Sequence, residues 1–293
     1  MSKVVTESIK SLLYPSDVNY KLFFKSSHAE CYNMLISHVL FTYIRLSGKQ
    51  GHIIISADMD ESIITYCRAA MDAKLCSVSV INLDENLLID VKLLAAKVRE
   101  NTLLIILPLV AASGAINNIE LISLLAKKNE IPLCCNIDNL FPFQEIHLSS
   151  YGIDVFTYCN NFSKSNLIYP QFDLAVSQTV CTMGVWDKVI AGYKLDLMGP
   201  NSDFTKSTLH MVAKSLIVYS SANLKEYQII KSKLLAAFPP TIETIPGVIF
   251  LPSEIKITDR VKLVKVGDKF VLIFPIDLTV EEIETIIKMN KKK

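Results

Sequence analysis

The segment NTLLIILPLVAASGAINNIELISLLAKKNEIPLCCNIDN, residues 101–139, contains two apolar runs separated by an amphipathic stretch. The runs TLLIILPLV (102–110) and IPLCCNI (131–137) are continuous rather than alternating, which indicates strands buried on both faces, as in a parallel sheet. Between them, the apolar residues of 118–130 recur at helical spacing and form one stripe. This order of strand, helix and strand predicts a βαβ unit with a right-handed crossover.

The same alternation continues on both sides of this unit. The patterns indicate a strand and turn at 18–27, strands at 52–56, 76–83 and 153–158, and helices at 28–46, 60–74 and 90–101. Regular alternation of strands and helices is typical of α/β proteins. We therefore expect a doubly wound α/β fold with a mostly parallel sheet, in a large domain over residues 1–200.

The C-terminal part of the chain has a different character. The residue pattern predicts one or two connecting helices over residues 201–238, and the Pro-Pro pair that follows ends them. Three short strand patterns come next, and an amphipathic helix at 279–290 with Thr279 as its N-cap closes the chain. We expect residues 239–293 to form a small α+β domain.

Composition and charge narrow the class of protein. A chain of 293 residues, 51% of them hydrophobic, is long enough to bury a large core. The net charge of +1 argues against a nucleic-acid partner. The sequence contains no apolar stretch of about 18 residues, which argues against a membrane partner. The seven cysteines include no CxxC pair, which favours reduced thiols in a cytoplasmic protein. His147 and His210 have no metal-ligand spacing, so no metal site is expected.

Several segments resemble characteristic stretches of one enzyme family. They include FFKSSHAECYNM (23–34), HIIISADMDESIITYCRAA (52–70), YGIDVFTYCNNFSK (151–164) and LTVEEIETII (278–287). Their order and spacing are similar to those of the cysteine desulfurases, class V aminotransferase relatives among the fold-type I pyridoxal-phosphate (PLP) enzymes. The resemblance is good from residue 18 to about 165 and vague from there to about 268.

The resemblance implies a PLP cofactor, which serves such enzymes as an electron sink. The family holds it with a Schiff-base lysine, a carboxylate at the pyridine nitrogen, a stacking histidine and phosphate-binding hydroxyls. In this sequence the pyridine-binding Asp falls at Asn136 and the stacking His at Asp60. The Asn of a family loop falls at Val110 or Ala111, and a Gln after the Asp falls at Asn139.

The phosphate and lysine positions also differ from the family. The phosphate-binding Thr falls at Ala29, although Ser27 and His28 keep polar groups beside a helix start. The Schiff-base lysine falls at Phe162 unless a two-residue slip brings in Lys164. The other interpretation of Lys164 is an exposed loop lysine.

Structural interpretations stay open beside the functional ones. Asn136 either contacts the cofactor ring or caps a turn, His28 either binds phosphate or is an ordinary helix residue, and the helix dipole alone explains Asp60. If the family scaffold is kept, the cleft lies at the carboxyl ends of the strands and binds PLP weakly or not at all. Its predicted lining is Ser27, His28, Asp60, Ala111, Asn136, Asn139 and the 159–164 loop.

These differences predict a catalytically degenerate cysteine desulfurase-like protein in a binding or scaffolding role, as a homodimer or with another protein. The alternative is a PLP-dependent desulfurase or transferase that uses Lys164. An unrelated nucleotide-binding protein is disfavoured because neither GxGxxG nor GxxxxGK[ST] occurs. The Ile, Asn and Lys usage suits an AT-rich genome, such as those of large DNA viruses that carry divergent copies of these enzymes.

Overall fold

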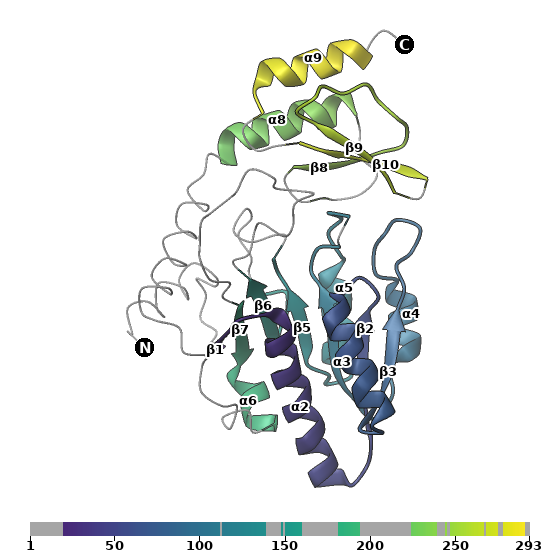
Figure 1. Ribbon diagram of the computed structural model, residues 1–293, viewed down its shortest axis with the longest axis vertical. Coiled ribbons are helices and arrows are strands. Elements are labelled where there is room, and N and C mark those ends of the chain that lie inside the picture. The colour runs from purple at the N-terminus through teal and green to yellow at the C-terminus, as the bar shows by residue number, and fades with distance from the viewer. Residues whose placement is uncertain are drawn as a thin grey trace, which may run out of the picture.

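The structure is a computed structural model. It describes residues 20–111, 113–138, 148, 150–159, 181–193, 224–238, 244, 247–266, 268–274 and 278–290. Within these ranges, the chain forms a seven-stranded sheet with helices on both faces, and a three-stranded sheet that carries its own helices (Figure 1).

The larger sheet is mixed and mostly parallel. Its strands are β1 (Tyr20–Lys25), β2 (Gly51–Ser56), β3 (Cys76–Ile81), β4 (Thr102–Pro108), β5 (Leu133–Asn136), β6 (Val155–Cys159) and β7 (Cys181–Trp186), in the order β1-β7-β6-β5-β4-β2-β3. Strands β6, β5, β4, β2 and β3 are parallel, whereas β7 is antiparallel to both of its neighbours, β6 and β1. The expected α/β fold with a mostly parallel sheet is confirmed.

Helices cover both faces of this sheet. The helices α2 (His28–Ser47), α3 (Glu61–Asp72) and α6 (Asp187–Tyr193) pack on one face, and α4 (Val91–Lys97) and α5 (Ile119–Lys128) pack on the other. Each face has its own hydrophobic cluster. Cys134 and Cys135 are neighbours on β5 and belong to different clusters, because adjacent side chains of a strand point to opposite faces.

The smaller sheet has the order β8-β10-β9 and is antiparallel. Its elements are β8 (Val248–Leu251), β9 (Lys262–Val266) and β10 (Lys269–Ile273), and α8 (Leu224–Ala237) and α9 (Val280–Asn290) cover the side away from the larger sheet (Figure 1). Along β8, Val248 and Phe250 join the core of the larger sheet, while Ile249 and Leu251 pack with residues of α8 and α9. The three strands and the closing helix predicted for this region are confirmed.

The closing helix begins as the sequence predicts. The hydroxyl of Thr279 accepts a hydrogen bond from the backbone N–H of Glu282 at 3.3 Å. The Glu282 carboxylate in turn accepts one from the N–H of Thr279 at 2.8 Å. This reciprocal pair is a capping box, so Thr279 is the N-cap of α9.

Two elements of the larger unit were not predicted, namely β7 and α6. Strand β7 has the sequence CTMGVW and is buried along all but its last residue. The predicted domain boundaries near residues 200 and 239 lie outside the described residues and stay predictions. No helix in the described part of the chain is long and apolar enough to cross a membrane.

Candidate functional site

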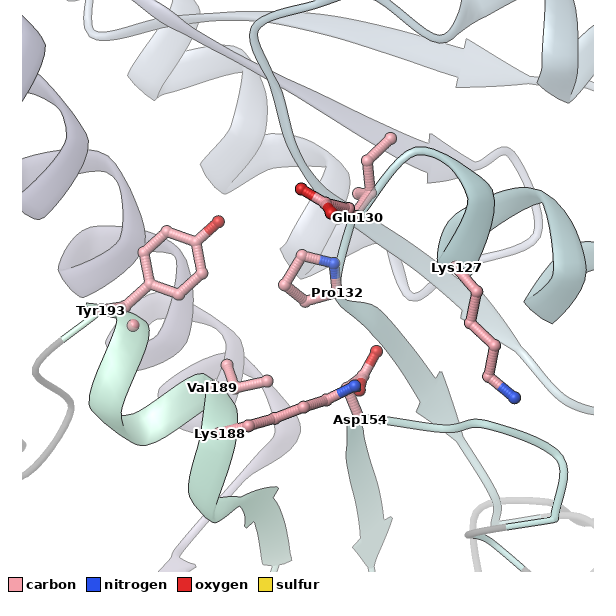
Figure 2. Close-up of a pocket in the computed structure, with 9 residues that line it drawn as sticks. Lys127, Glu130, Pro132, Asp154, Lys188, Val189 and Tyr193 are labelled. Atoms are coloured by element: carbon pink, nitrogen blue, oxygen red, sulfur yellow. The ribbon is translucent and has the colours of Figure 1, made fainter.

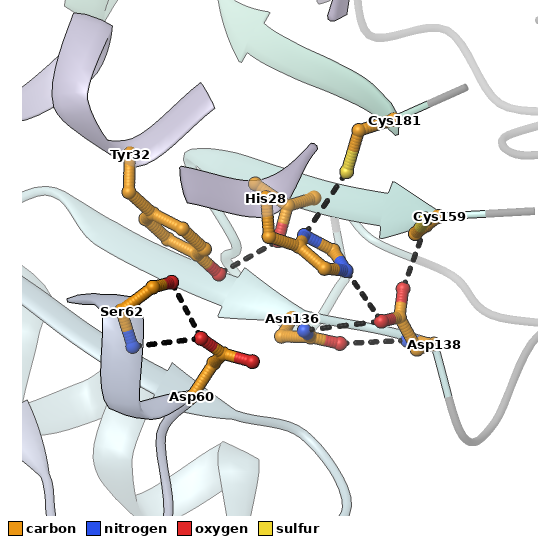
Figure 3. Close-up of polar contacts among 9 residues, drawn as sticks. His28, Tyr32, Asp60, Ser62, Asn136, Asp138, Cys159 and Cys181 are labelled. Atoms are coloured by element: carbon orange, nitrogen blue, oxygen red, sulfur yellow. Dashed lines mark hydrogen bonds and ion pairs between the residues drawn. The ribbon is translucent and has the colours of Figure 1, made fainter. Parts of the chain in front are cut away.

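Polar side chains gather at the edge of the larger sheet where the parallel strands end. His28 is the first residue of α2, Asn136 is the last of β5 and Cys159 is the last of β6. Cys181 begins the antiparallel strand β7, which places it at the same edge. Figure 3 shows these side chains around Asp138, which follows β5 by two residues. The predicted cleft and this cluster therefore share one edge of the sheet.

The Asp138 carboxylate is the centre of the cluster. Its Oδ2 atom lies 2.5 Å from Nε2 of His28, and its Oδ1 atom accepts the backbone N–H of Cys159 at 2.7 Å. Asn136 donates its amide Nδ2 to Oδ2 at 3.3 Å and accepts the N–H of Asp138 on Oδ1 at 2.9 Å. Both carboxylate oxygens are thus bound by groups from the chain itself.

The neighbouring carboxylate decides the charge of His28. Burial by itself lowers the pKa of His28, but the charge and the hydrogen bond of Asp138 outweigh burial and raise the pKa to about 9. His28 is therefore a cation at neutral pH, and it forms an ion pair with Asp138. Its second nitrogen, Nδ1, lies 3.1 Å from Sγ of Cys181.

Three thiols lie beside this ion pair. Cys159 and Cys181 face each other as a register pair of the β6–β7 ladder. Burial, together with the neighbouring thiols of Cys159 and Cys31, raises the pKa of Cys181 far above its usual range. Cys31 lies one helical turn after His28 on α2 and is fully buried. The buried thiol of Cys181 is therefore neutral unless a metal ion or a base takes its proton.

The structure gives most of the predicted site residues a structural contact. The hydroxyl of Ser27 caps α2 by accepting the N–H of Glu30, and the carboxylate of Asp60 caps α3 by accepting the N–H of Ser62 at 2.8 Å. Ala111 is fully buried and donates its N–H to the carbonyl of Ala115. The helix-terminus interpretation of Asp60 agrees with this geometry.

Among the predicted site positions that the structure describes, three meet in the cluster: His28, Asn136 and Cys159 of the 159–164 loop. His28 and Asn136 both bind Asp138. Asn139, Lys164 and the rest of the 159–164 loop lie outside the described residues, apart from Cys159.

Sequence reasoning missed Asp138 and Cys181 as members of the site. The sequence assigns no role to Asp138, and it does not distinguish Cys181 from the other cysteines. One sequence feature could have indicated Asp138, because it follows Asn136 by two residues at the carboxyl end of a predicted strand. Ligands of parallel sheets bind at these strand ends. Cys181 has no such signal, because its position depends on an unpredicted strand.

PLP, the cofactor implied by the sequence resemblance, can be compared with the described residues. A pyridinium nitrogen needs a nearby carboxylate, but Asn136 is neutral and both oxygens of Asp138 are bound by groups of the chain. At the stacking position, Asp60 offers no ring and its carboxylate binds the start of α3. The described residues therefore do not fit PLP held in the family's manner.

A separate cavity of about 540 Å³ lies at the opposite edge of the sheet, where β5 and β6 begin (Figure 2). Its most buried charge is Asp154, which accepts the N–H of Leu133 at 2.9 Å and pairs with Nζ of Lys188 at 2.6 Å. Lys188 also lies 3.9 Å from the ring centroid of Trp186. These contacts join β5, β6 and the start of α6, which gives Asp154 a structural role.

Comparisons with known proteins agree with this architecture. The family described as Aminotransferase class-V matches residues 7–160. No curated protein sequence matches the chain significantly. Among solved structures, a NifS-like protein from Rickettsia africae has a TM-score of 0.63 at 17% identity, over 98% of this chain and 86% of that one.

Two further solved structures are similar to the chain. Another NifS-like protein has a TM-score of 0.65 at 15% identity, over 97% of this chain and 85% of that one. A sphingosine-1-phosphate lyase from Burkholderia pseudomallei has a TM-score of 0.65 at 11% identity, over 99% of this chain and 77% of that one. At these identities the likeness shows the fold alone.

Proposed function

We propose that this chain, which belongs to the class V aminotransferase family, is a catalytically degenerate cysteine desulfurase-like member with a binding or scaffolding role. The observation that carries the proposal is the His28–Asp138 ion pair at the carboxyl edge of the sheet. Asn136 takes the place of the family's pyridine-binding Asp. The only carboxylate described in the cluster, that of Asp138, is neutralised by the cationic ring of His28.

The electrostatics of the cluster support this proposal. PLP enzymes stabilise a protonated pyridine with a carboxylate, and a neutral amide cannot supply that charge. Freeing Asp138 for a cofactor would leave His28 as an unpaired, largely buried cation, which raises the free energy of the site. Binding of the ring nitrogen therefore competes with the internal ion pair.

The partner and the compartment are part of the proposal. We expect a homodimer or a complex with another protein, and the outer side of α2 offers the exposed apolar side chains Phe41 and Leu46 for such a contact. The free cysteines of the described residues are in keeping with a reducing compartment, and we expect the protein to act in the cytoplasm.

A PLP titration with two readouts tests the proposed function. The purified protein is titrated with PLP while visible absorbance is recorded, and sulfide release from cysteine is then measured against a control without protein. We expect neither a saturable absorbance change at micromolar PLP nor sulfide above the control.

One variant separates the alternative from the proposal. If the wild-type protein binds micromolar PLP and releases sulfide, and Lys164→Ala abolishes both, the chain is an active PLP enzyme and the proposal is wrong. Ser163→Ala, a change beside Lys164, is the matched control and is expected to leave both readouts as in the wild type.

A further inference from the structure

We infer that His28, Cys159 and Cys181 form a binding site for zinc or a similar thiophilic divalent cation, with Asp138 orienting the imidazole. Their three ligand atoms all lie within 4.8 Å of one another. Figure 3 shows the sulfur of Cys181 beside the His28 ring, with Cys159 next to the Asp138 carboxylate. The inference goes beyond the proposed function and does not rest on it.

The spacing of the ligand atoms suits a tetrahedral ion. Bond lengths of about 2.3 Å to sulfur and about 2.0 Å to nitrogen place the tetrahedral ligand atoms roughly 3.5–3.8 Å apart. The distance from Nδ1 of His28 to Sγ of Cys181 is 3.1 Å, and the whole group lies within 4.8 Å. Shifts of about 1 Å or less, within the reach of side-chain rotation, therefore bring the three atoms to bonding positions.

The chemistry of the donors selects the kind of ion. Thiolates and an imidazole favour zinc and other soft or borderline cations over magnesium and calcium, which prefer oxygen ligands. Cys31 interacts with the thiol of Cys181 and is a candidate for the fourth ligand. The alternative fourth ligand is a solvent molecule, because Cys159 and His28 are only partly buried.

Asp138 supplies the outer contact that histidine ligands of metals use. A ligating imidazole normally donates its other ring N–H to a carboxylate, which fixes the ring and raises its basicity. Here Nε2 of His28 faces Asp138 at 2.5 Å and would keep its proton, whereas Nδ1 faces the sulfur of Cys181 and would release its proton to solvent, as the thiols would, when a metal ion binds. The backbone N–H of Cys159 holds the same carboxylate in place. An ion at this position would join α2, β6 and β7.

Zinc and cobalt titrations of the full chain test the inference. The protein is purified reduced and metal-free, and zinc affinity is measured by competition with a chromophoric chelator. Cobalt(II) serves as the spectroscopic probe. We expect one equivalent of metal, with cobalt(II) absorption bands of at least two thiolate ligands and near-tetrahedral geometry.

Matched variants assign the ligands. Because Cys159 is at the partly exposed end of β6, the Cys159→Ser variant should fold. Loss of a contact outside the metal's own ligands weakens binding by about 10- to 100-fold, and we expect loss of the Cys159 ligand to weaken zinc binding by more than that. Asp138→Asn is expected to weaken binding by about 10- to 100-fold. Cys67→Ser, at a buried thiol of α3 in the same hydrophobic cluster, should bind zinc like the wild type.

Several outcomes would overturn the inference. They are no stoichiometric binding by the reduced wild type, equal binding by a folded Cys159→Ser variant, and an equal loss in Cys67→Ser. Circular dichroism confirms the fold of each variant. Metal binding and PLP binding are separate readouts, so this inference and the proposed function fail independently.

Discussion

The ring of Phe156 on β6 lies directly over the backbone of Gly184 on β7, its register partner across the antiparallel ladder. A Cβ atom added at Gly184 would come within 2.0 Å of Cε1 of Phe156. The ring is fully buried and packs edge-on against Tyr20 with 5.3 Å between ring centroids, so it has little room to move. The strand β7 therefore requires glycine at this position.

The first prediction follows from this contact. Gly184→Ala is expected to lower the free energy of unfolding by about 1–3 kcal/mol, because it overpacks a rigid part of the core. Urea denaturation measures the loss. Gly192→Ala is the matched control, since a Cβ there meets nothing within 4 Å. In the double variant Gly184→Ala/Phe156→Leu, the smaller leucine should make room for the new methyl group, so the two losses of stability should sum to more than the loss of the double variant. If the two losses simply add, the assigned contact is wrong.

The second prediction concerns the buried imidazole of His52. It lies between the hydroxyls of Thr102 and Ser79, at 2.8 and 2.9 Å. Burial, followed by the positive charge of Arg99, lowers the pKa of His52 from 6.5 to about 4. Because the unfolded chain then binds the proton more tightly, the stabilisation is present above pH 6.5 and is lost as the pH falls towards 4.

His52→Gln removes this titration. We expect the unfolding free energy of the wild type to fall more steeply between pH 6.5 and 4 than that of the variant, with an excess slope of up to about 1.4 kcal/mol per pH unit. Urea denaturation at a series of pH values gives the two slopes. The carboxylates titrate in both proteins, so parallel curves would show that His52 does not carry the effect.

The third prediction concerns Asp154 at the amino-terminal edge of the sheet. Asp154→Ala leaves the buried N–H of Leu133 without its acceptor and removes the partner of Lys188. We expect a loss of about 1–3 kcal/mol, because a buried donor is left unsatisfied, while the ion pair with the half-exposed Lys188 adds little. Glu130→Gln changes an exposed carboxylate that lines the same cavity, and it should alter stability by less than about 0.5 kcal/mol. Similar losses in both variants would rule out a special role for Asp154.

The fourth prediction separates a capping role of Asp60 from a cofactor role. Asp60→Ala is expected to cost about 1 kcal/mol, because the N–H of Ser62 loses its acceptor, whereas Asp60→Ser keeps a capping oxygen and most of the stability. Thermal or urea unfolding measures both variants. Equal losses in the two variants would contradict the capping role.

Continuous apolar runs made much of the larger sheet predictable. Strands β2 and β4 are buried along their whole length, and their sequences contain the apolar runs expected of parallel strands. Strand β7 was missed although Cys181, Met183 and Val185 alternate towards one cluster. Its Gly184 is typical of a strand break, and only the ring of Phe156 explains why glycine lies inside this strand.

The candidate site was less predictable than the fold. Polar residues at strand ends and helix starts serve as caps or as ligands, and the sequence does not distinguish the two roles of Ser27 and Asp60. The partners of His28 are 110 and 153 residues away in the chain, at Asp138 and Cys181. Such pairs depend on the packing of α2 against β5, β6 and β7, which no local pattern reports.

The two-sided burial of the smaller sheet has a consequence for motion. Val248, Phe250, Val271 and Ile273 are buried in the core of the larger sheet, and Val248 packs against Gly114. Swinging this lobe away as a hinged lid would expose all four side chains, at about 1.5–3 kcal/mol each. That cost approaches the whole stability of a typical domain, about 5–15 kcal/mol. The lobe therefore behaves as a fixed wall beside the larger sheet.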